Sequence, residues 1–497
     1  MGRALMVQGT SSGSGKSVLV AGLCRVFRRM GFKVAPFKAQ NMSLNSYVSA
    51  DGGEIARAQV FQALAAGVEP LTIMNPVLLK PRGDSLSQVI VLGKPVVDLD
   101  AKSYWSFALS RCWRAITRAL RRLMEEFDVV VVEGAGSPAE INLYEYDVAN
   151  MRVAEYAKSP VVLVADIERG GVFASIYGTV KLLKPRHRRL LRGFVVNKFR
   201  GDLDILRPGL ERLERELGIP CLGVLPYVEG LKAPLEDSLS LSELTALRPG
   251  GVDVAVVRLP KISNFTDFEP LKLDESFSLR LVASKGDLGR PDVVVIPGSK
   301  NTISDLEWLN EVGLADAIVN LAGKTLVMGV CAGYQMLGSK VVDEGVETST
   351  PKVVEGLNLL DVETRFTSYR KELLRVEAEV LGFSPLLKPV EGLRFKGYVI
   401  HMGRTTRRSC KPAFKLVKPR ARLEGAIGLD GTVIGTCLHG LFDEPPMRIA
   451  LAKLKGLEVS MSRDVWSVWN EELDRLASIV ESRVDVDFML NELRLKR

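Results

Sequence analysis

The sequence predicts an α/β protein with two doubly wound domains, each a parallel sheet with helices on both faces. Two observations carry this prediction. Short β-branched runs alternate with helical patterns in both halves of the chain, and a stretch rich in glycine and proline separates the halves. Strands that alternate with helices pair in parallel and are covered on both faces. The chain of 497 residues is long enough for two or three ordinary cores.

The first half begins with a strand, a glycine loop and a helix, and it then continues the alternation. The predicted strands span residues 4–7, 33–37, 128–133, 160–166 and 193–197. The predicted helices span residues 16–30, 54–66, 104–127 and 203–217. This half is the predicted phosphate-loop domain, residues 1–235.

The alternation stops between residues 228 and 251, where Gly230, Pro234, Pro249 and Gly250 lie among polar residues. We interpret residues 236–251 as a linker. A second alternation follows, and with a helical tail over residues 447–497 it forms the second predicted domain, residues 252–497. Its predicted strands span residues 252–258, 292–296, 325–330 and 433–437.

Composition narrows the class of protein. Hydrophobic residues make up 46% and charged residues 25%, which is typical of globular chains. We find no apolar run of membrane-spanning length and no signal-peptide pattern, so we expect a cytoplasmic protein without a membrane partner. The net charge of +8 fits an acidic small substrate, and no motif supports nucleic-acid binding. The six cysteines form no CxxC pair, which argues against a zinc site.

A phosphate-binding loop is predicted at residues 9–17, with the sequence GTSSGSGKS, between the first strand and the first helix. Backbone N–H groups at a helix N-terminus bind phosphate oxygens, a lysine neutralises them and a serine can ligate Mg²⁺. The strict pattern has glycine at position 10, where this chain has threonine, so the loop is a variant. The predicted phosphate-binding residues are Gly9, Thr10, Gly13, Gly15, Lys16 and Ser17.

Polar residues at the ends of later strands complete this prediction. Glu133 ends an apolar strand, where a metal ligand or a water-orienting group belongs. Glu54 precedes a predicted helix and is either a helix cap or a metal ligand. Asn197 and Lys198 end a later strand, and this dipeptide resembles the base-reading residues of many nucleotide-binding loops.

A nucleophilic cysteine is predicted at residue 331, where an apolar strand runs through Gly-Val-Cys-Ala-Gly into a helix. This order is typical of a nucleophile elbow. A helix N-terminus lowers the pKa of a thiol, and the N–H of Ala332 can form half of an oxyanion hole. The loop after the preceding strand, with Gly298, is the predicted donor of the other half.

The catalytic base is expected to be a histidine downstream of the nucleophile. His439 follows an apolar strand and is favoured. His401 is the rival, and its surroundings in the sequence also suit substrate contact or a structural role.

The cysteine elbow with a late histidine resembles the class I glutamine amidotransferase domain. Most members of that class have a glutamate two residues after the histidine, but this chain has Leu441 there. The third member of the triad is therefore left open, with Glu444 as one alternative.

The first half resembles the dethiobiotin synthetase family of ATP-dependent ligases, which has the same loop spacing. The resemblance implies that Lys38 contacts phosphate and that ATP is bound with Mg²⁺. It also implies that Ser17, Glu54 and Glu133 hold the metal.

The order of the two halves, with further long motifs, resembles the cobyric acid synthase family over essentially the whole chain. The matching stretches are 38–46 (KAQNMSLNS), 74–81 (MNPVLLKP), 134–143 (GAGSPAEINL), 197–202 (NKFRGD) and 401–404 (HMGR). The resemblance implies ATP-dependent amidation of the b, d, e and g carboxylates of adenosylcobyrinic acid a,c-diamide through acyl phosphates. The ammonia would come from glutamine.

Within this resemblance, several polar residues are candidates for substrate contact. We expect the corrinoid or the phosphate to contact Asn41, Ser43, Asn45 and Ser46. We expect Lys80 and Asn142 to line the carboxylate site.

Two rival functions stay open at this point. One is a ligase of the same architecture for another polycarboxylate, such as the related a,c-diamide synthase. The other is a partitioning-type ATPase, which would leave the Cys331 elbow unexplained. The oligomeric state does not follow from the sequence.

Overall fold

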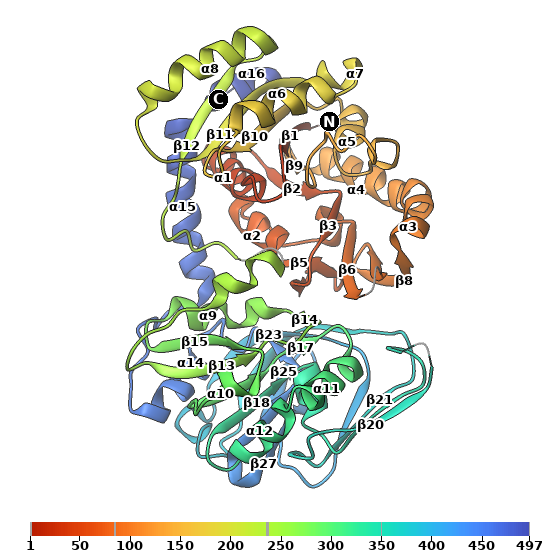
Figure 1. Cartoon of the computed structure of the whole chain (residues 1–497), viewed down its shortest axis with the longest axis vertical. Coiled ribbons are helices and arrows are strands. Elements are labelled where there is room, and N and C mark those ends of the chain that lie inside the picture. The colour runs from red at the N-terminus through yellow and green to blue at the C-terminus, as the bar shows by residue number, and fades with distance from the viewer. Residues whose placement is uncertain (1, 84–85, 235–237, 349, 497) are drawn as a thin grey trace.

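The computed structural model describes residues 2–83, 86–234, 238–348 and 350–496. The chain forms two lobes, each built on a six-stranded sheet (Figure 1). The sheet of the first lobe is entirely parallel, with the order β12-β11-β10-β1-β9-β2. Its strands are β1 (Arg3–Gly9), β2 (Val34–Lys38), β9 (Val129–Glu133), β10 (Val161–Asp166), β11 (Leu191–Phe199) and β12 (Cys221–Pro226). The predicted α/β class with parallel sheets is confirmed.

Alternate residues of these strands enter two separate cores, because side chains in a strand point to opposite faces. In β1, Ala4 and Met6 belong to one core, while Leu5 and Val7 belong to the other. Helices cover both faces, as a buried parallel sheet requires. The first core is closed by α4 (Trp113–Glu126), α5 (Met151–Ala157), α6 (Val172–Leu182) and α8 (Leu203–Leu217).

The second core of this lobe is closed by α1 (Lys16–Arg29) together with the end of the chain. The tail helices α15 (Val465–Arg483) and α16 (Val486–Leu493) pack their apolar side chains against β1 and α1. Figure 1 shows α15 running from the second lobe back along the first. The sequence analysis placed the whole tail, residues 447–497, in the second domain. Its first part, residues 447–452, does pack in the core of the second lobe, whereas the apolar side chains of α15 and α16 are buried in a core of the first lobe.

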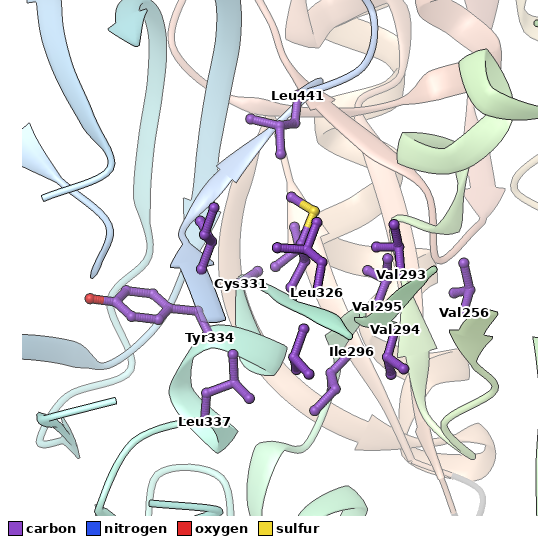
Figure 2. Packing of buried hydrophobic residues seen from close by; sticks show 14 of the residues in the cluster. Val256, Val293, Val294, Val295, Ile296, Leu326, Cys331, Tyr334, Leu337 and Leu441 are labelled. Carbon is purple, nitrogen blue, oxygen red and sulfur yellow. The ribbon is translucent and has the colours of Figure 1, made fainter. Parts of the chain in front are cut away.

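The second lobe has a sheet of order β15-β13-β16-β18-β28-β27, parallel except for the edge strand β27. Its strands are β13 (Val252–Val257), β15 (Phe277–Val282), β16 (Val293–Ile296), β18 (Leu326–Val330), β27 (Ala426–Gly428) and β28 (Val433–Thr436). Figure 2 shows Ile296, Leu326 and Cys331 in the core of this sheet. An antiparallel sheet lies beside it and includes β22 (Glu372–Val380), β23 (Arg394–His401) and β29 (Leu438–His439).

Smaller elements of the first lobe correct one predicted helix. The helix predicted over residues 54–66 begins only at Arg57, as α2 (Arg57–Ala66). Residues before it form β5 (Glu54–Ala56), which pairs with β4 (Ser46–Val48). A four-stranded sheet contains β3 (Gln40–Met42), β6 (Val77–Gly83), β7 (Leu86–Val91) and β8 (Lys94–Asp100). The β4–β5 hairpin thus turns Glu54 away from a helix N-terminus.

The lobes are joined by the stretch between β12 and β13, which contains the 3-10 helix Ser238–Leu244. The predicted domain boundary between residues 235 and 236 lies outside the described residues. Within the described part of the chain, every helix is too short or too polar to span a lipid bilayer.

The packing of the tail predicts a specific loss of stability. Leu473 in α15 is 0% exposed in the core of the first lobe, so we expect Leu473→Ala to cost about 2–5 kcal/mol of unfolding free energy. Leu454→Ala is the control, because Leu454 is 43% exposed, and should change stability by less than about 0.5 kcal/mol. Urea unfolding followed by circular dichroism measures both. Equal effects would contradict the docking of the tail.

Candidate active sites

Cys331 lies in a strained turn between β18 and α13 (Ala332–Met336), the arrangement predicted for a nucleophile. Its φ of 55° is uncommon for a residue with a side chain and indicates local strain. The turn also needs Gly333, since a Cβ there would lie 1.9 Å from the carbonyl oxygen of Ile296. The sheet, the glycine and the following helix together fix the thiol at the carboxyl end of β18.

His439 lies beside Cys331 and is oriented by a carboxylate. Its Nδ1 is 2.6 Å from Oδ2 of Asp267, and the two side chains are buried. The backbone N–H of Gly440 donates to Oδ1 of the same carboxylate at 3.0 Å. His439 also shares a hydrogen bond with Cys331, whose Sγ lies 3.5 Å from the carbonyl oxygen of Ile400. Cys331, His439 and Asp267 form a cysteine–histidine–aspartate triad.

The charges of this triad favour a thiolate–imidazolium pair. Burial by itself raises the pKa of the Cys331 thiol, but the hydrogen bond and the charge of His439 bring that pKa below its ordinary value. Burial lowers the pKa of His439, but the charge and hydrogen bond of Asp267 outweigh it and raise that pKa to about 10. In such an ion pair the cysteine would be a nucleophile and the histidine a proton donor.

Asp267 was missed by sequence reasoning, because we searched downstream of His439 for the third member. The alternative, Glu444, instead accepts a hydrogen bond from the backbone N–H of Lys396 at 3.0 Å. Asp267 lies upstream of the nucleophile, in the 3-10 helix Phe265–Phe268. The only local signal was an acidic residue soon after a core strand, which is too common to be diagnostic.

His401, the rival base, lies in the wall of the same small cavity as Cys331. Its Nδ1 lies 3.1 Å from the carbonyl oxygen of Gly403, and its Nε2 lies 3.4 Å from Oε2 of Glu372. Both ring nitrogens therefore have partners other than the thiol. The geometry favours His439 as the base.

The two predicted oxyanion-hole residues flank the triad. Ala332 is the first residue of α13, directly after Cys331, and lines the cavity of about 40 Å³ next to the thiol. Gly298 lies on the short strand β17 (Gly298–Ser299), and a Cβ there would lie 3.7 Å from Cε1 of His439. Both backbones are thus near the place where an oxyanion would form.

The glycine loop of the first lobe wraps the N-terminus of α1. Gly15 has a φ of 94°, and a Cβ there would lie 1.9 Å from Nδ2 of Asn197, so only glycine fits. The same Nδ2 donates to the carbonyl of Ser14 at 3.0 Å, and Lys198 Nζ donates to the carbonyl of Gly13 at 3.0 Å. Asn197 and Lys198 therefore support the loop from behind.

Hydrogen bonds within the protein hold the other residues of the loop. Lys16 Nζ donates to the carbonyls of Ser11 at 2.8 Å and Gly136 at 3.0 Å, so it bridges the loop to the segment after β9. The N–H of Thr10 donates to the carbonyl of Val164 at 2.9 Å, which ties the start of the loop to β10. Gly9 packs against the Ser14 hydroxyl.

Glu133 is the polar centre of this site. Its Oε1 accepts hydrogen bonds from Ser17 Oγ at 2.8 Å and from Lys38 Nζ at 2.5 Å, and its Oε2 accepts from Gln62 Nε2 at 2.5 Å. Burial raises the pKa of this carboxyl, but Lys38 and the hydrogen bonds lower it overall, so Glu133 is a carboxylate. Ser17 and Glu133 form an oxygen donor pair that fits Mg²⁺ beside a phosphate loop. Gln62 was not foreseen from the sequence.

Glu54 does not join that donor pair, which contradicts its predicted role as a metal ligand. Its carboxylate forms ion pairs with Lys80 and, at 2.7 Å, with Lys371 of the second lobe. Burial raises the pKa of Glu54, and the lysines lower it well below its ordinary value. The β4–β5 hairpin directs this carboxylate to the boundary between the lobes. No cluster of three potential metal-binding histidine, cysteine or carboxylate side chains occurs among the described residues.

The residues predicted to contact substrate are dispersed. Asn41 donates from Nδ2 to Oε1 of Gln59 at 2.8 Å, and the N–H of Asn45 donates to Oγ of Ser43 at 3.1 Å. Asn142 lies exposed in the loop after β9. The contact of Asn41 and Ser43 with the corrinoid or the phosphate, and the place of Asn142 in the carboxylate site, stay predictions.

Asn45, Ser46 and Lys80 lie where the lobes meet. Ser46 and Asn45 contact residues 264–266 of the second lobe. Lys80 is fully buried against Glu54, on the opposite face of β6 from Leu79 and Pro81. The structure therefore contradicts the prediction that Lys80 lines a carboxylate site.

A large cleft of about 670 Å³ opens beside the phosphate loop. Leu79 and Pro81 of β6 line one side, Trp105 lies on another, and Gly136, the partner of Lys16, lies at the end near the loop. The lining is largely apolar and aromatic, which is typical of a site for a sizeable organic ligand.

Comparison with known proteins gives matches over nearly the whole chain. Residues 5–241 match the CobQ/CobB/MinD/ParA nucleotide binding domain, and residues 253–447 match the CobB/CobQ-like glutamine amidotransferase domain. A probable cobyric acid synthase of Methanosarcina barkeri is 47% identical over 490 residues, covering 98% of each chain. The cobyric acid synthase of Pelotomaculum thermopropionicum is 47% identical over 503 residues, covering 98% of this chain and 96% of the relative.

The raised pKa of His439 predicts a pH-dependent contribution to stability. A group whose pKa rises on folding, here from 6.5 to about 10, stabilises the fold fully below about pH 6.5. That contribution declines as the pH rises towards 10. We therefore expect Asp267→Asn to destabilise the protein more at pH 6 than at pH 10, as measured by urea unfolding.

Asp474→Asn is the matched control for this measurement. Asp474 pairs with Arg25 at 2.9 Å, and this hydrogen-bonded pair lowers its pKa below 3.8. Its contribution is therefore present throughout the range from pH 6 to 10. A pH-independent effect of Asp267→Asn would contradict the ionised His439–Asp267 pair.

Proposed function

This chain belongs to the cobyric acid synthase family, which performs glutamine-dependent amidation in cobalamin biosynthesis, and from that premise we propose which residues perform each half-reaction. The observation that carries the proposal is a Cys331–His439–Asp267 triad in the same chain as a phosphate loop with Glu133 behind it. The triad releases ammonia, and the phosphate loop with Glu133 activates a carboxylate.

In the glutaminase half, the Cys331 thiolate attacks the side-chain carbonyl carbon of glutamine. The carbon–nitrogen bond breaks as His439 gives its proton to the departing nitrogen, which leaves as ammonia. Water then cleaves the thioester and releases glutamate. The N–H groups of Ala332 and Gly298 stabilise the oxyanion, and Asp267 keeps the imidazole in the required orientation. The short His439–Asp267 contact supports these roles.

In the ligase half, a substrate carboxylate oxygen attacks the γ-phosphorus of ATP, and the bond to ADP breaks. Ammonia then attacks the acyl carbon, and phosphate leaves. Lys16, assisted by Lys38, stabilises the charge of the transferring phosphoryl group, while the loop backbone holds the phosphates. Ser17 and Glu133 would hold Mg²⁺, which supplies further positive charge to the phosphoryl oxygens when it is bound. Asn197 and Lys198 keep the loop in shape from behind.

The acceptor is adenosylcobyrinic acid a,c-diamide, amidated at its b, d, e and g carboxylates, and we propose that it binds in the 670 Å³ cleft. The apolar lining suits a macrocycle face, and the nearness of Gly136 to Lys16 would bring a peripheral carboxylate to the phosphate loop. The charged residues in the lining are acidic, namely Asp100, Glu140 and Asp147. They would repel carboxylates, so we expect the amidated edge to lie against them.

We propose that the ligase unit comprises residues 1–235 together with the two tail helices, and that the glutaminase unit begins at residue 252. The packing of α15 and α16 on the first sheet supports this division. ATP and glutamine, the two proposed co-substrates, are abundant in the cytoplasm, which is the predicted location.

If Cys331 is the nucleophile, its replacement should affect amidation with glutamine but not amidation with ammonium. We expect Cys331→Ser to lower glutamine-dependent amidation by about 10³-fold or more, since the thiolate is lost. Amidation with ammonium should continue, because the ligase half does not need the thiol. The measurement is glutamate release and ATP turnover with cobyrinic acid a,c-diamide as acceptor. Cys410→Ser is the control. Loss of both activities in Cys331→Ser would contradict the assignment.

The cleft assignment predicts an effect on acceptor affinity. Trp105 lines the cleft and packs against Tyr146 at 5.0 Å between ring centroids. We expect Trp105→Ala to raise the KM for the corrinoid about tenfold, as loss of an aromatic contact typically does. The KM for glutamine should not change. Trp113→Ala is the control, because Trp113 packs against Tyr156 away from the cleft lining. An unchanged corrinoid KM would place the acceptor elsewhere.

A further inference from the structure

Two polar segments from different lobes meet directly beside the triad. The backbone N–H of Asn264 donates to the carbonyl of Leu44 at 3.3 Å. The N–H of Ser46 donates to Oδ1 of Asn264 at 3.0 Å, and the N–H of Thr266 lies 3.4 Å from Oδ1 of Asn45. Residues 44–46 therefore dock on residues 264–266 through backbone and side-chain hydrogen bonds, and the side chains of Asn45, Ser46, Asn264 and Thr266 are buried.

Asn264 extends this contact to the catalytic histidine. Its Nδ2 lies 3.5 Å from each ring nitrogen of His439, while its Oδ1 accepts from Ser46. Its backbone has a φ of 53°, an uncommon conformation for a residue with a side chain. Asp267, the partner of His439, follows three positions later in the same turn. A displacement of Asn264 would therefore also change the positions of His439 and of Asp267.

On its other side, Ser46 is bound to the charged cluster beneath the large cleft. Ser46 Oγ donates to Oε1 of Glu54 at 2.8 Å and accepts from Lys80 Nζ at 2.5 Å. Lys80 is on β6 between Leu79 and Pro81, which line the cleft on the opposite face of the strand. One strand thus contacts the cleft with one face and Ser46 with the other.

The Ser46 hydroxyl can take two arrangements. Its oxygen lies 2.8 Å from Glu54 Oε1 and 3.4 Å from Asn264 Oδ1, and a hydroxyl has a single proton to donate. It therefore donates either to Glu54 or to Asn264. A movement of β6 that alters the ion pair between Lys80 and Glu54 would change which of these two oxygens accepts the hydrogen bond from Ser46.

We propose that Ser46 and Asn264 form an interlobe relay that couples filling of the cleft to the position of His439. Asn264 acts as a positioning residue for glutamine hydrolysis. The proposal rests on the proposed function, because it needs the triad as the glutaminase and the cleft as the acceptor site. Its consequence is that glutamine hydrolysis accelerates when ATP and corrinoid are bound, so that ammonia is released when an acyl phosphate can use it.

The test compares glutamine hydrolysis with and without ATP and cobyrinic acid a,c-diamide. For the wild type we expect acceptor-dependent stimulation in the range of ordinary coupling energies, about 5–150-fold. In Ser46→Ala the relay hydroxyl is missing, and the stimulation ratio should fall to about one. Ser46→Cys keeps the side-chain size but is a weak hydrogen-bond donor, so its ratio should also fall.

Ser49→Ala is the matched control. Ser49 is as buried as Ser46 and lies in the same hairpin, but its hydroxyl bonds to Gly53 within that hairpin. We expect Ser49→Ala to keep the wild-type ratio. We expect Asn264→Ala to lower the stimulation ratio to about one. It should also shift the pH profile of glutamine hydrolysis, because Asn264 contacts the His439 ring.

The relay is overturned if both Ser46 variants keep the wild-type stimulation, if Ser49→Ala loses it equally, or if the wild type shows none. Failure of the proposed function has a different signature. In that case the wild type would fail to amidate the corrinoid with ammonium, or Cys331→Ser would keep its glutaminase activity.

Discussion

A buried ion pair between Arg57 and Asp443 holds the two lobes in register. Arg57 Nη2 lies 2.8 Å from Asp443 Oδ2, and both side chains are almost completely removed from water. Breaking such a pair is costly, because either partner alone would be a buried unpaired charge. The guanidinium also lies within about 5 Å of three aromatic rings, those of Tyr47, Trp466 and Trp469. Among the described residues, Arg57 Nε and Nη1 have no hydrogen-bond partner, so these rings are their main surroundings.

The Arg57–Asp443 pair connects segments that carry residues of both candidate sites. Arg57 begins α2, whose Gln62 binds Glu133 at the phosphate loop. Asp443 follows closely after His439 of the triad. Trp466 and Trp469 belong to α15, the helix that returns to the first lobe. One contact therefore links the phosphate site, the glutaminase site and the tail, and the relative position of the two reaction centres depends on it.

Charge is distributed unevenly at the boundary between the lobes. Glu54 is surrounded by Lys80, Lys371 and Lys300, all buried or nearly so. Burial and the neighbouring lysines lower the pKa of Lys371 to about 8 despite the attraction of Glu54. Lys300 and Lys371 also line the small cavity beside Cys331. Burial and the neighbouring lysines also lower the pKa of Lys300 well below its ordinary value, so this boundary favours neutral over protonated amines.

The sequence by itself determined the features that depend on short stretches of chain. The phosphate loop, the Cys331 elbow and the strands that carry them are each specified by a local strand–loop–helix pattern, so their residues could be predicted without a partner. His439 could be favoured because it follows a core strand. The parallel sheets also followed from the alternation of elements, and the family followed from motifs spread over the chain.

The tertiary structure alone decided which distant residues meet. Asp267 reaches His439 because the 3-10 helix Phe265–Phe268 meets strand β29, and Gln62 reaches Glu133 from helix α2. Glu54 was assigned to a metal by the resemblance to the dethiobiotin synthetase family, yet the β4–β5 hairpin turns it to Lys371 of the other lobe. The tail helices α15 and α16 belong to the first lobe because their apolar side chains complete the core that α1 forms with its sheet. A local sequence pattern specifies a helix, strand or loop and the functional side chains that it carries. Burial and strand order decide which distant residues those side chains contact.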